Sequence, residues 1–222
     1  MTVITRVPPS TQLQQTGVMA ILRARSAERF LDVSRVLVES GVTCLEITLT
    51  SPGALETIAA VRAELPDTVD IGAGTVTTAA EAHDAVAAGA GFVVSPSTEP
   101  DVIAAALEAG IPSYPGAFTA TEVLAAWRAG ASVVKLFPAA TLGPSYVKHL
   151  SGPFPQVAIM PTGGVGLADI GAWIAAGVVG VGLGGPLLGD AAGGGDLDAL
   201  ADRAKRALSE VAEARRATAP QA

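Results

Sequence analysis

Short apolar runs alternate along the chain with Ala-rich segments in which apolar positions repeat with the helical period. From Val18 onward the apolar runs predict strands at 18–23, 44–49, 69–75, 92–96, 111–116, 132–138, 157–163 and 178–185. Runs of this length with almost no polar interruption are typical of strands that are buried on both faces. The pattern therefore predicts eight strands, each followed by a helix.

The segments between the strands also carry signals for helix ends. A glycine follows five of the helical segments, as expected for residues just past a helix C-terminus: Gly41, Gly89, Gly110, Gly130 and Gly177. Hydroxyl side chains that can cap a helix N-terminus precede four segments: Ser26, Ser51, Thr78 and Thr119.

Eight alternating β and α units predict an α/β protein with a parallel sheet, closed into a single (β/α)8 barrel (TIM barrel). A doubly wound open sheet is the alternative. The barrel is favoured because eight units fit into 222 residues with short connections, and no Gly-rich dinucleotide fingerprint follows the first strand. We expect one domain over residues 1–222, with residues 1–16 and 217–222 as mobile ends.

Composition narrows the function. Half of the residues are hydrophobic, so a large core can form, and the net charge of -7 disfavours nucleic acid and anionic membrane surfaces as partners. The N-terminal stretch lacks the apolar core of a signal peptide, and the single cysteine, Cys44, permits no internal disulfide. These features predict a cytoplasmic protein that acts on a small molecule.

Lys135 lies inside an apolar strand, unlike Lys148 and Lys205. A buried ammonium group must pair with a carboxylate or lose its proton, and an uncharged lysine is a nucleophile for ketones. Glu46 lies in another apolar strand, on the face that alternation assigns to the barrel interior. The two residues are predicted to meet, either as a structural ion pair or as a catalytic pair.

Further polar and small residues follow the strands at their carboxyl ends, where barrel enzymes build their sites. These candidates for substrate binding are Arg23, Thr75, Pro96, Phe137 and Thr162. Glycines after the last two strands are candidates for binding a phosphate through backbone N–H groups, although such glycines also serve turns alone: Gly163, Gly164, Gly184 and Gly185. His83 and His149 have no partners at ligand spacing, so no metal site and no cofactor are expected, and Cys44 is expected to be a buried filler.

Several motifs, in order from Val18 to Leu188, resemble those of the class I 2-keto-3-deoxy-6-phosphogluconate and 4-hydroxy-2-oxoglutarate aldolase family, including its 6-phosphogalactonate branch. They include AILRA (20–24), LEITLTSP (45–52), GAGTV (72–76), VVKLFPA (133–139) and PTGGV (161–165). The resemblance implies a homotrimeric barrel that cleaves a 2-keto-3-deoxy sugar acid or 4-hydroxy-2-oxoglutarate to pyruvate and an aldehyde.

The resemblance also implies a role for each candidate residue. Lys135 would form the Schiff base, and Glu46 would move protons through a bound water. Thr75, Thr162 and Phe137 would surround the pyruvyl group, and Arg23 would bind a carboxylate or the polar tail. The four glycines 163, 164, 184 and 185 would hold the terminal phosphate.

Two positions depart from the family pattern. Thr50 stands where some members have Arg, and Gly185 followed by Pro186 stands where many have Ser in the phosphate loop. The second change removes a hydroxyl group and an N–H donor, which weakens the expectation of a phosphorylated substrate. Two alternatives to an aldolase remain at this point: a phosphosugar isomerase or epimerase, and a non-catalytic barrel that binds sugar phosphates.

Overall fold

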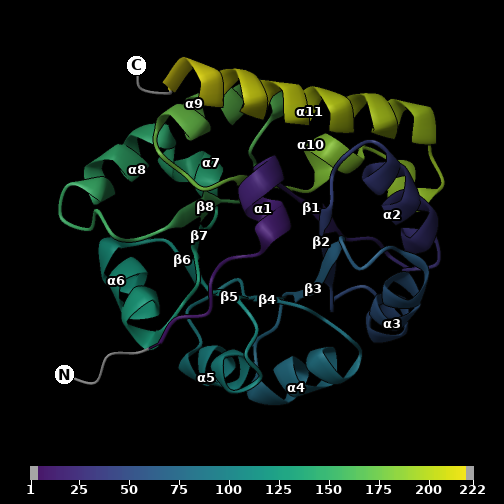
Figure 1. Cartoon of the computed structure of the whole chain (residues 1–222), viewed down its shortest axis with the longest axis horizontal. Coiled ribbons are helices and arrows are strands. Elements are labelled where there is room, and N and C mark those ends of the chain that lie inside the picture. The colour runs from purple at the N-terminus through teal and green to yellow at the C-terminus, as the bar shows by residue number, and fades with distance from the viewer. Residues whose placement is uncertain (1–4, 219–222) are drawn as a thin grey trace.

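A computed structural model describes residues 5–218. Its strands are β1 (Val18–Leu22), β2 (Cys44–Thr48), β3 (Asp70–Gly74), β4 (Val93–Val94), β5 (Ser113–Tyr114), β6 (Gly116–Ala117), β7 (Val134–Leu136), β8 (Ile159–Pro161) and β9 (Val181–Leu183). The strands lie inside a surrounding layer of helices (Figure 1).

The longer helices are α2 (Phe30–Glu39), α3 (Ala54–Glu64), α4 (Ala79–Ala87), α5 (Pro100–Glu108), α6 (Ala120–Ala129), α8 (Pro144–Ser151) and α11 (Leu197–Thr218). Shorter helices complete the chain: α1 (Thr11–Thr16), α7 (Ala139–Leu142), α9 (Ile170–Ala175), α10 (Gly185–Leu188) and the 3₁₀ turns η1 (Leu167–Asp169) and η2 (Ala191–Gly193). All five predicted C-terminal glycines have positive φ, and Thr78 and Thr119 form capping boxes, as predicted.

The other two predicted caps are wrong. The N-cap of α2 is Arg29, three residues after Ser26, and the N-cap of α3 is Gly53 rather than Ser51. Ser51 instead accepts a hydrogen bond from the Ala24 backbone N–H at 3.2 Å, so it joins two neighbouring loops.

Two parallel sheets make up the strand layer. One has the order β5-β4-β3-β2-β1-β9 and is open at both edges, and the other has the order β6-β7-β8. A bridge between Thr162 and Gly182 links β8 to β9. The protein is thus an α/β fold with parallel strands covered by helices.

The fifth predicted strand is two short strands, separated by Pro115. A proline has no N–H to donate, so the ladder is interrupted there. The backbone nevertheless continues to pair on both sides, because Tyr114 O accepts from Ser95 N at 3.2 Å and Pro115 O accepts from Lys135 N at 2.9 Å.

Alternation along the strands separates two cores. Leu45 and Ile47 pack in the larger core between strands and helices, whereas Cys44 packs in a small inner cluster. Phe92 and Tyr114 meet in this inner cluster with ring centroids 5.4 Å apart. The predicted faces of the second strand are therefore the faces that the structure has.

Helix α1 differs from the expected mobile end, because it crosses one end of the strand layer (Figure 1). Leu13 is fully buried in the inner cluster. Ser10 caps the helix, its N–H donates to the Tyr114 hydroxyl at 2.8 Å, and its hydroxyl donates to Asp70. The burial of Leu13 and the two bonds to Tyr114 and Asp70 hold residues 10–16 on the strands, while residues 1–4 and 219–222 lie outside the described range.

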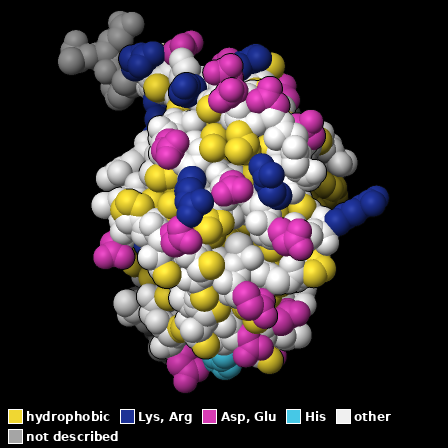
Figure 2. Space-filling model, turned by 90° about the vertical axis from the view of Figure 1, so that its right-hand side faces the viewer, with side chains coloured by type: hydrophobic (Ala, Val, Ile, Leu, Met, Phe, Trp, Pro, Cys, Tyr) yellow, Lys and Arg dark blue, Asp and Glu magenta, His cyan; other side chains and the backbone are white. Residues whose placement is uncertain are grey.

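Acidic and basic side chains are interspersed over the outer surface of α2, α3 and their neighbours (Figure 2). Over the described residues, no helix has both the length and the apolar composition needed to cross a membrane.

Candidate active site

A pocket of about 210 Å³ opens where β1, β7, β8 and β9 end. It is lined by eight of the predicted site residues, Arg23, Lys135, Phe137, Thr162, Gly163, Gly164, Gly184 and Gly185. Residues from both sheets thus contribute to one cavity at the carboxyl ends of parallel strands, the expected position for a site in such a fold.

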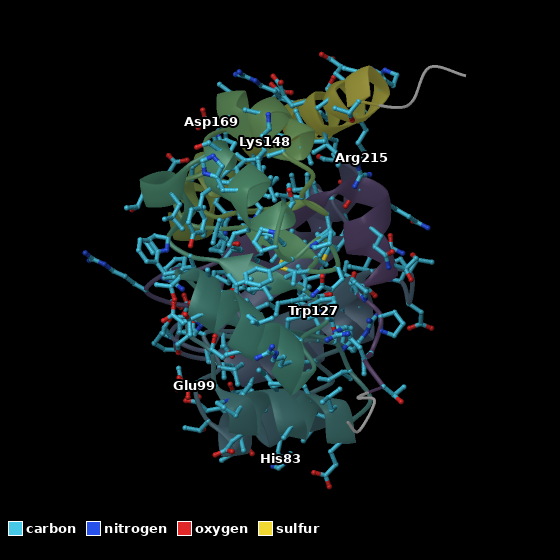
Figure 3. The ribbon with its side chains drawn as sticks, turned by 90° about the vertical axis from the view of Figure 1, so that its left-hand side faces the viewer. His83, Glu99, Trp127, Lys148, Asp169 and Arg215 are labelled. Atoms are coloured by element: carbon cyan, nitrogen blue, oxygen red, sulfur yellow. The ribbon has the colours of Figure 1, made fainter. Side chains whose placement is uncertain are left out.

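Lys135 comes from the middle of β7 and is 3% exposed. Burial lowers the pKa of its ammonium group; the charge of Glu46 opposes this shift and the charge of Arg23 adds to it. The Nζ atom lies 5.1 Å from the centre of the Phe137 ring. Lys148 and Lys205 are exposed, and Figure 3 shows Lys148 on the outer helical layer. Lys135 is therefore the lysine placed to act as a nucleophile.

Glu46 lies on β2 and is fully buried, and neither carboxylate oxygen has a hydrogen-bond partner among the described residues. Burial raises the pKa of this carboxyl, against the charges of Lys135 and Arg23. Within the described chain, Lys135 and Glu46 form no ion pair. The charges of Lys135 and Glu46 nevertheless shift each other's pKa, so the two side chains interact through the interior without forming an ion pair in the described chain.

Gly74 on β3 provides the space for the Glu46 side chain. A Cβ at position 74 would overlap the Oε1, Cδ and Cγ atoms of Glu46. Gly72, two residues earlier on the same face of the strand, leaves space for Phe92 in the same way. The inward face of β3 therefore has no side chains at these two positions, and the acid of β2 lies against bare backbone.

Arg23 and Thr75 form a pair at the end of β1 and β3. The Nη2 atom of Arg23 donates to the Thr75 hydroxyl at 3.0 Å. Thr75 has φ 61°, a left-handed conformation that is strained for a β-branched residue. The strained turn directs the hydroxyl to Arg23 and thereby helps to fix the guanidinium at the rim of the pocket.

The glycines after β8 bring the backbone close to the pocket. Gly163 and Gly164 have positive φ, and a side chain at 163 would overlap the Phe137 ring. In the described part of the chain, neither amide donates a backbone hydrogen bond, so both remain free for a ligand. Gly184 and Gly185 lie opposite at the start of α10, where Pro186 supplies no donor.

Three predicted residues do not line the pocket: Glu46, Thr75 and Pro96. Glu46 lies deeper, Thr75 reaches the site through Arg23, and the carbonyl of Pro96 packs against the backbone of Gly116. Sequence reasoning missed other lining residues, including Ile21 and Gly182. Ile21 could have been predicted, because it lies two residues before Arg23 and alternation along β1 puts both on the same face. Gly182 makes space for the buried hydroxyl of Thr162, which has no hydrogen-bond partner among the described residues.

The pocket thus combines a buried amine of lowered pKa, a cation and free backbone N–H groups, and the buried carboxyl of Glu46, of raised pKa, lies outside its lining. This set can attack a ketone, move protons and bind an anion. Among the described residues, no cluster of three or more His, Cys, Asp or Glu side chains is suited to hold a metal ion.

The family model for KDPG and KHG aldolase matches residues 10–202. The chain is 35% identical over 164 residues to 2-dehydro-3-deoxy-phosphogluconate aldolase of Treponema pallidum (strain Nichols), covering 73% of this chain and 78% of the relative. It is 38% identical over 180 residues to the probable 2-dehydro-3-deoxy-6-phosphogalactonate aldolase of Rhizobium meliloti (strain 1021), covering 81% and 85%.

The structure is similar to that of KDPG aldolase from Legionella pneumophila with pyruvate captured at low pH as a covalent carbinolamine intermediate. The TM-score is 0.82 and the identity 30%, over 89% of this chain and 96% of that chain.

Proposed function

The chain belongs to the KDPG and KHG aldolase family and is a class I aldehyde-lyase, and we propose that Lys135 forms its Schiff base. The proposed substrates are 2-keto-3-deoxy-6-phospho sugar acids, cleaved to pyruvate and glyceraldehyde 3-phosphate, and 4-hydroxy-2-oxoglutarate, cleaved to pyruvate and glyoxylate. The observation that carries the assignment is the buried Lys135 amine of lowered pKa in a pocket with Arg23 and Thr162.

In the proposed reaction the Lys135 amine attacks the C2 carbonyl, and loss of water gives a protonated imine. Removal of the C4 hydroxyl proton then breaks the C3–C4 bond, whose electron pair moves into the imine and leaves an enamine. The aldehyde departs, C3 takes up a proton, and water hydrolyses the imine to pyruvate and free Lys135. The cationic imine stabilises the developing carbanion, so the step needs no further electron sink.

We assign the proton transfers to Glu46. Burial raises the pKa of this carboxyl above its ordinary value, which makes it a stronger base than an exposed carboxylate, and a positioned carboxyl can serve as general acid and base. Among the described residues its two oxygens have no hydrogen-bond partner, and we propose that a water molecule between Glu46 and the imine would bond to them and carry the protons.

We assign the substrate carboxylate to Arg23, held by Thr75, and the pyruvyl group to the space between Phe137 and Thr162. Pro96 is assigned only a supporting position, since it lies behind Gly116. The free amides at Gly163 and Gly164, with Gly184 and Gly185 opposite, are assigned to an anionic tail.

We further propose that the two sheets form one closed (β/α)8 barrel in a single domain. The support is the backbone pairing on both sides of Pro115 and the bridge between Thr162 and Gly182. A homotrimer in the cytoplasm is also proposed. Phe118, 37% exposed just before α6, offers an apolar contact for a second copy. Light scattering at micromolar concentration tests the trimer against a monomer mass near 22.1 kDa.

The test of the assignment is borohydride reduction in the presence of pyruvate, followed by mass spectrometry of the digest. A three-carbon adduct on Lys135 with loss of activity is expected, and Lys148 and Lys205 serve as internal controls on the exposed surface. An adduct on another lysine, or none, contradicts the Schiff-base assignment and favours a non-covalent isomerase. A panel of 2-keto-3-deoxy acids with and without phosphate, assayed for pyruvate release, then identifies the substrate.

A further inference from the structure

Arg23 follows the last residue of β1 and is exposed, so neither the strand nor burial fixes its side chain. A long exposed side chain samples many rotamers, and ordering it on a ligand costs conformational entropy. Over the described residues, its guanidinium makes one hydrogen bond, to the Thr75 hydroxyl at 3.0 Å. The position of the guanidinium in the pocket therefore also depends on how the backbone at residue 23 is held.

Two buried hydroxyl groups in the turn after β2 hold this backbone. Thr48 Oγ1 donates to Leu22 O at 3.1 Å, and the Ala24 N–H donates to Ser51 Oγ at 3.2 Å. The two hydroxyl oxygens lie 3.2 Å apart. Thr48 is fully buried and Ser51 is 1% exposed, so these bonds are shielded from water and are stronger than they would be at the surface.

The direction of this chain of hydrogen bonds follows from the number of protons. A hydroxyl group has one proton to donate, and Thr48 gives its proton to the Leu22 carbonyl. Ser51 is therefore the donor in the bond between the two hydroxyl groups. The chain runs from the Ala24 N–H through Ser51 and Thr48 to the Leu22 carbonyl, and every donor in it has an acceptor.

The two ends of this hydroxyl chain are the peptide groups on either side of the Arg23 Cα. The orientations of these two planar groups define φ and ψ of Arg23, and φ and ψ decide which side-chain rotamers are allowed. The hydroxyl chain thus fixes the direction in which the Arg23 side chain leaves the backbone, and Thr75 holds its far end.

The turn that carries the hydroxyl groups is itself held by backbone bonds. A bond of 3.0 Å joins the first and last residues of the turn at 48–51, and the Leu49 N–H donates to Gly74 O at 2.8 Å. Strands β1, β2 and β3 lie side by side (Figure 1), and Gly74 directly precedes Thr75. The same turn is therefore connected to both ends of the Arg23 side chain.

From these contacts we propose that Thr48 and Ser51 are positioning residues for Arg23, which hold its guanidinium in the pocket before the substrate binds. This inference rests on the proposed function, in which Arg23 binds the substrate carboxylate, and deepens it. Neither Thr48 nor Ser51 lines the pocket, so both act through Arg23 and not through contact with the substrate.

The test compares Ser51→Ala with wild type in the borohydride trapping of pyruvate, at pyruvate concentrations that span half-saturation. Ser132→Ala is the matched control, because Ser132 is 2% exposed and accepts a backbone N–H, that of Ser113, at the same distance of 3.2 Å. Loss of the hydroxyl chain should raise the pyruvate concentration for half-maximal trapping about three- to tenfold in Ser51→Ala. The maximal trapping rate, and both values in Ser132→Ala, should stay near those of wild type.

A neutral ketone and a second position separate loss of positioning from loss of structure. Pyruvamide has the same ketone without the carboxylate charge, so its half-saturation should not change in Ser51→Ala. Thr48→Val removes the other hydroxyl and should weaken pyruvate binding in the same way, and Thr48→Ser should restore it. Equal weakening for pyruvate and pyruvamide, or equal weakening in Ser51→Ala and Ser132→Ala, overturns the proposal in favour of a general loss of structure.

A double-mutant cycle shows whether Ser51 acts through Arg23. In the Arg23→Gln background, Ser51→Ala should cause no further loss of pyruvate binding, and a further loss of the same size overturns the proposal.

A crystal structure of Ser51→Ala gives a readout that needs no chemistry. We expect the 3.0 Å bond from Arg23 to Thr75 to be lost, and its persistence overturns the proposal. Absence of trapping in wild type, or normal pyruvate binding in Arg23→Gln, contradicts the proposed function instead. The crystal structure then still decides whether Ser51 positions Arg23.

Discussion

Replacing Gly74 by Ala tests whether the position of the Glu46 carboxyl is what makes this site work. The added methyl group occupies the space of Oε1, Cδ and Cγ of Glu46, while the backbone at 74 is not in a conformation that excludes Ala. Because the added methyl group would lie within 1.9–2.5 Å of these atoms, Glu46 must turn away from its present position. Lys135, on β7, is not touched by the change.

The expected magnitudes follow from this overlap. Overpacking an interior position costs about 1–3 kcal/mol, which for a chain of this size lowers the Tm by roughly 2–12 °C. Displacing a positioned acid and base should lower turnover and the exchange of pyruvate methyl protons by about 10²–10⁴-fold. Borohydride trapping of pyruvate should continue, since the nucleophile remains.

Gly72→Ala is the matched control, because it overpacks the same strand on the same face against Phe92 in place of Glu46. It should lose similar stability and keep its exchange activity. The assay is deuterium exchange into pyruvate and a thermal melt on the same preparations. Equal exchange per folded molecule in the two variants would refute this reasoning, because it would show that proton exchange does not depend on the position of the Glu46 carboxyl.

Two further predictions concern the charges of the site. Glu46→Gln should lower the exchange of pyruvate methyl protons by about 10²–10⁴-fold. Its Tm should stay near that of wild type, because the substitution breaks no ion pair with Lys135 in the described chain. A large drop in Tm with normal exchange would instead make Glu46 a purely structural charge. The rate of pyruvate trapping should rise with pH to a midpoint below the ordinary lysine pKa of about 10.4, because burial lowers the pKa of Lys135. Glu46 raises the pKa of Lys135 and Arg23 lowers it, so the midpoint should fall further in Glu46→Gln and rise in Arg23→Gln. A midpoint above about 10.4 in wild type would contradict the lowered pKa.

Apolar patterning was sufficient to predict the alternation of strands and helices from Val18 onward, apart from the division of the fifth strand, and the face on which Glu46 lies. Both depend on local periodicity, and a one-residue shift would move every side chain of β2 to the opposite face. The helix caps at Gly130, Thr78 and Thr119 could also be predicted, because a cap depends on residues that are neighbours in the chain.

Other features depend on residues far apart in the sequence and were not predicted. Nothing near Glu46 indicates that Gly74 makes space for it, and the short N-terminal segment shows no sign that Ser10 will bond to Asp70 and Tyr114.

The pairing of β1 with β9 joins the first strand of the chain to the last. At about 5–20 residues per second, roughly 10–30 s pass on the ribosome between synthesis of Val18 and of Val181. Throughout this interval the edge of β1 that will bond to β9 has no partner strand, and exposed apolar edges promote association between chains. The last part of the chain therefore protects the first, and the nascent protein passes through a stage at which aggregation competes with completion of the fold.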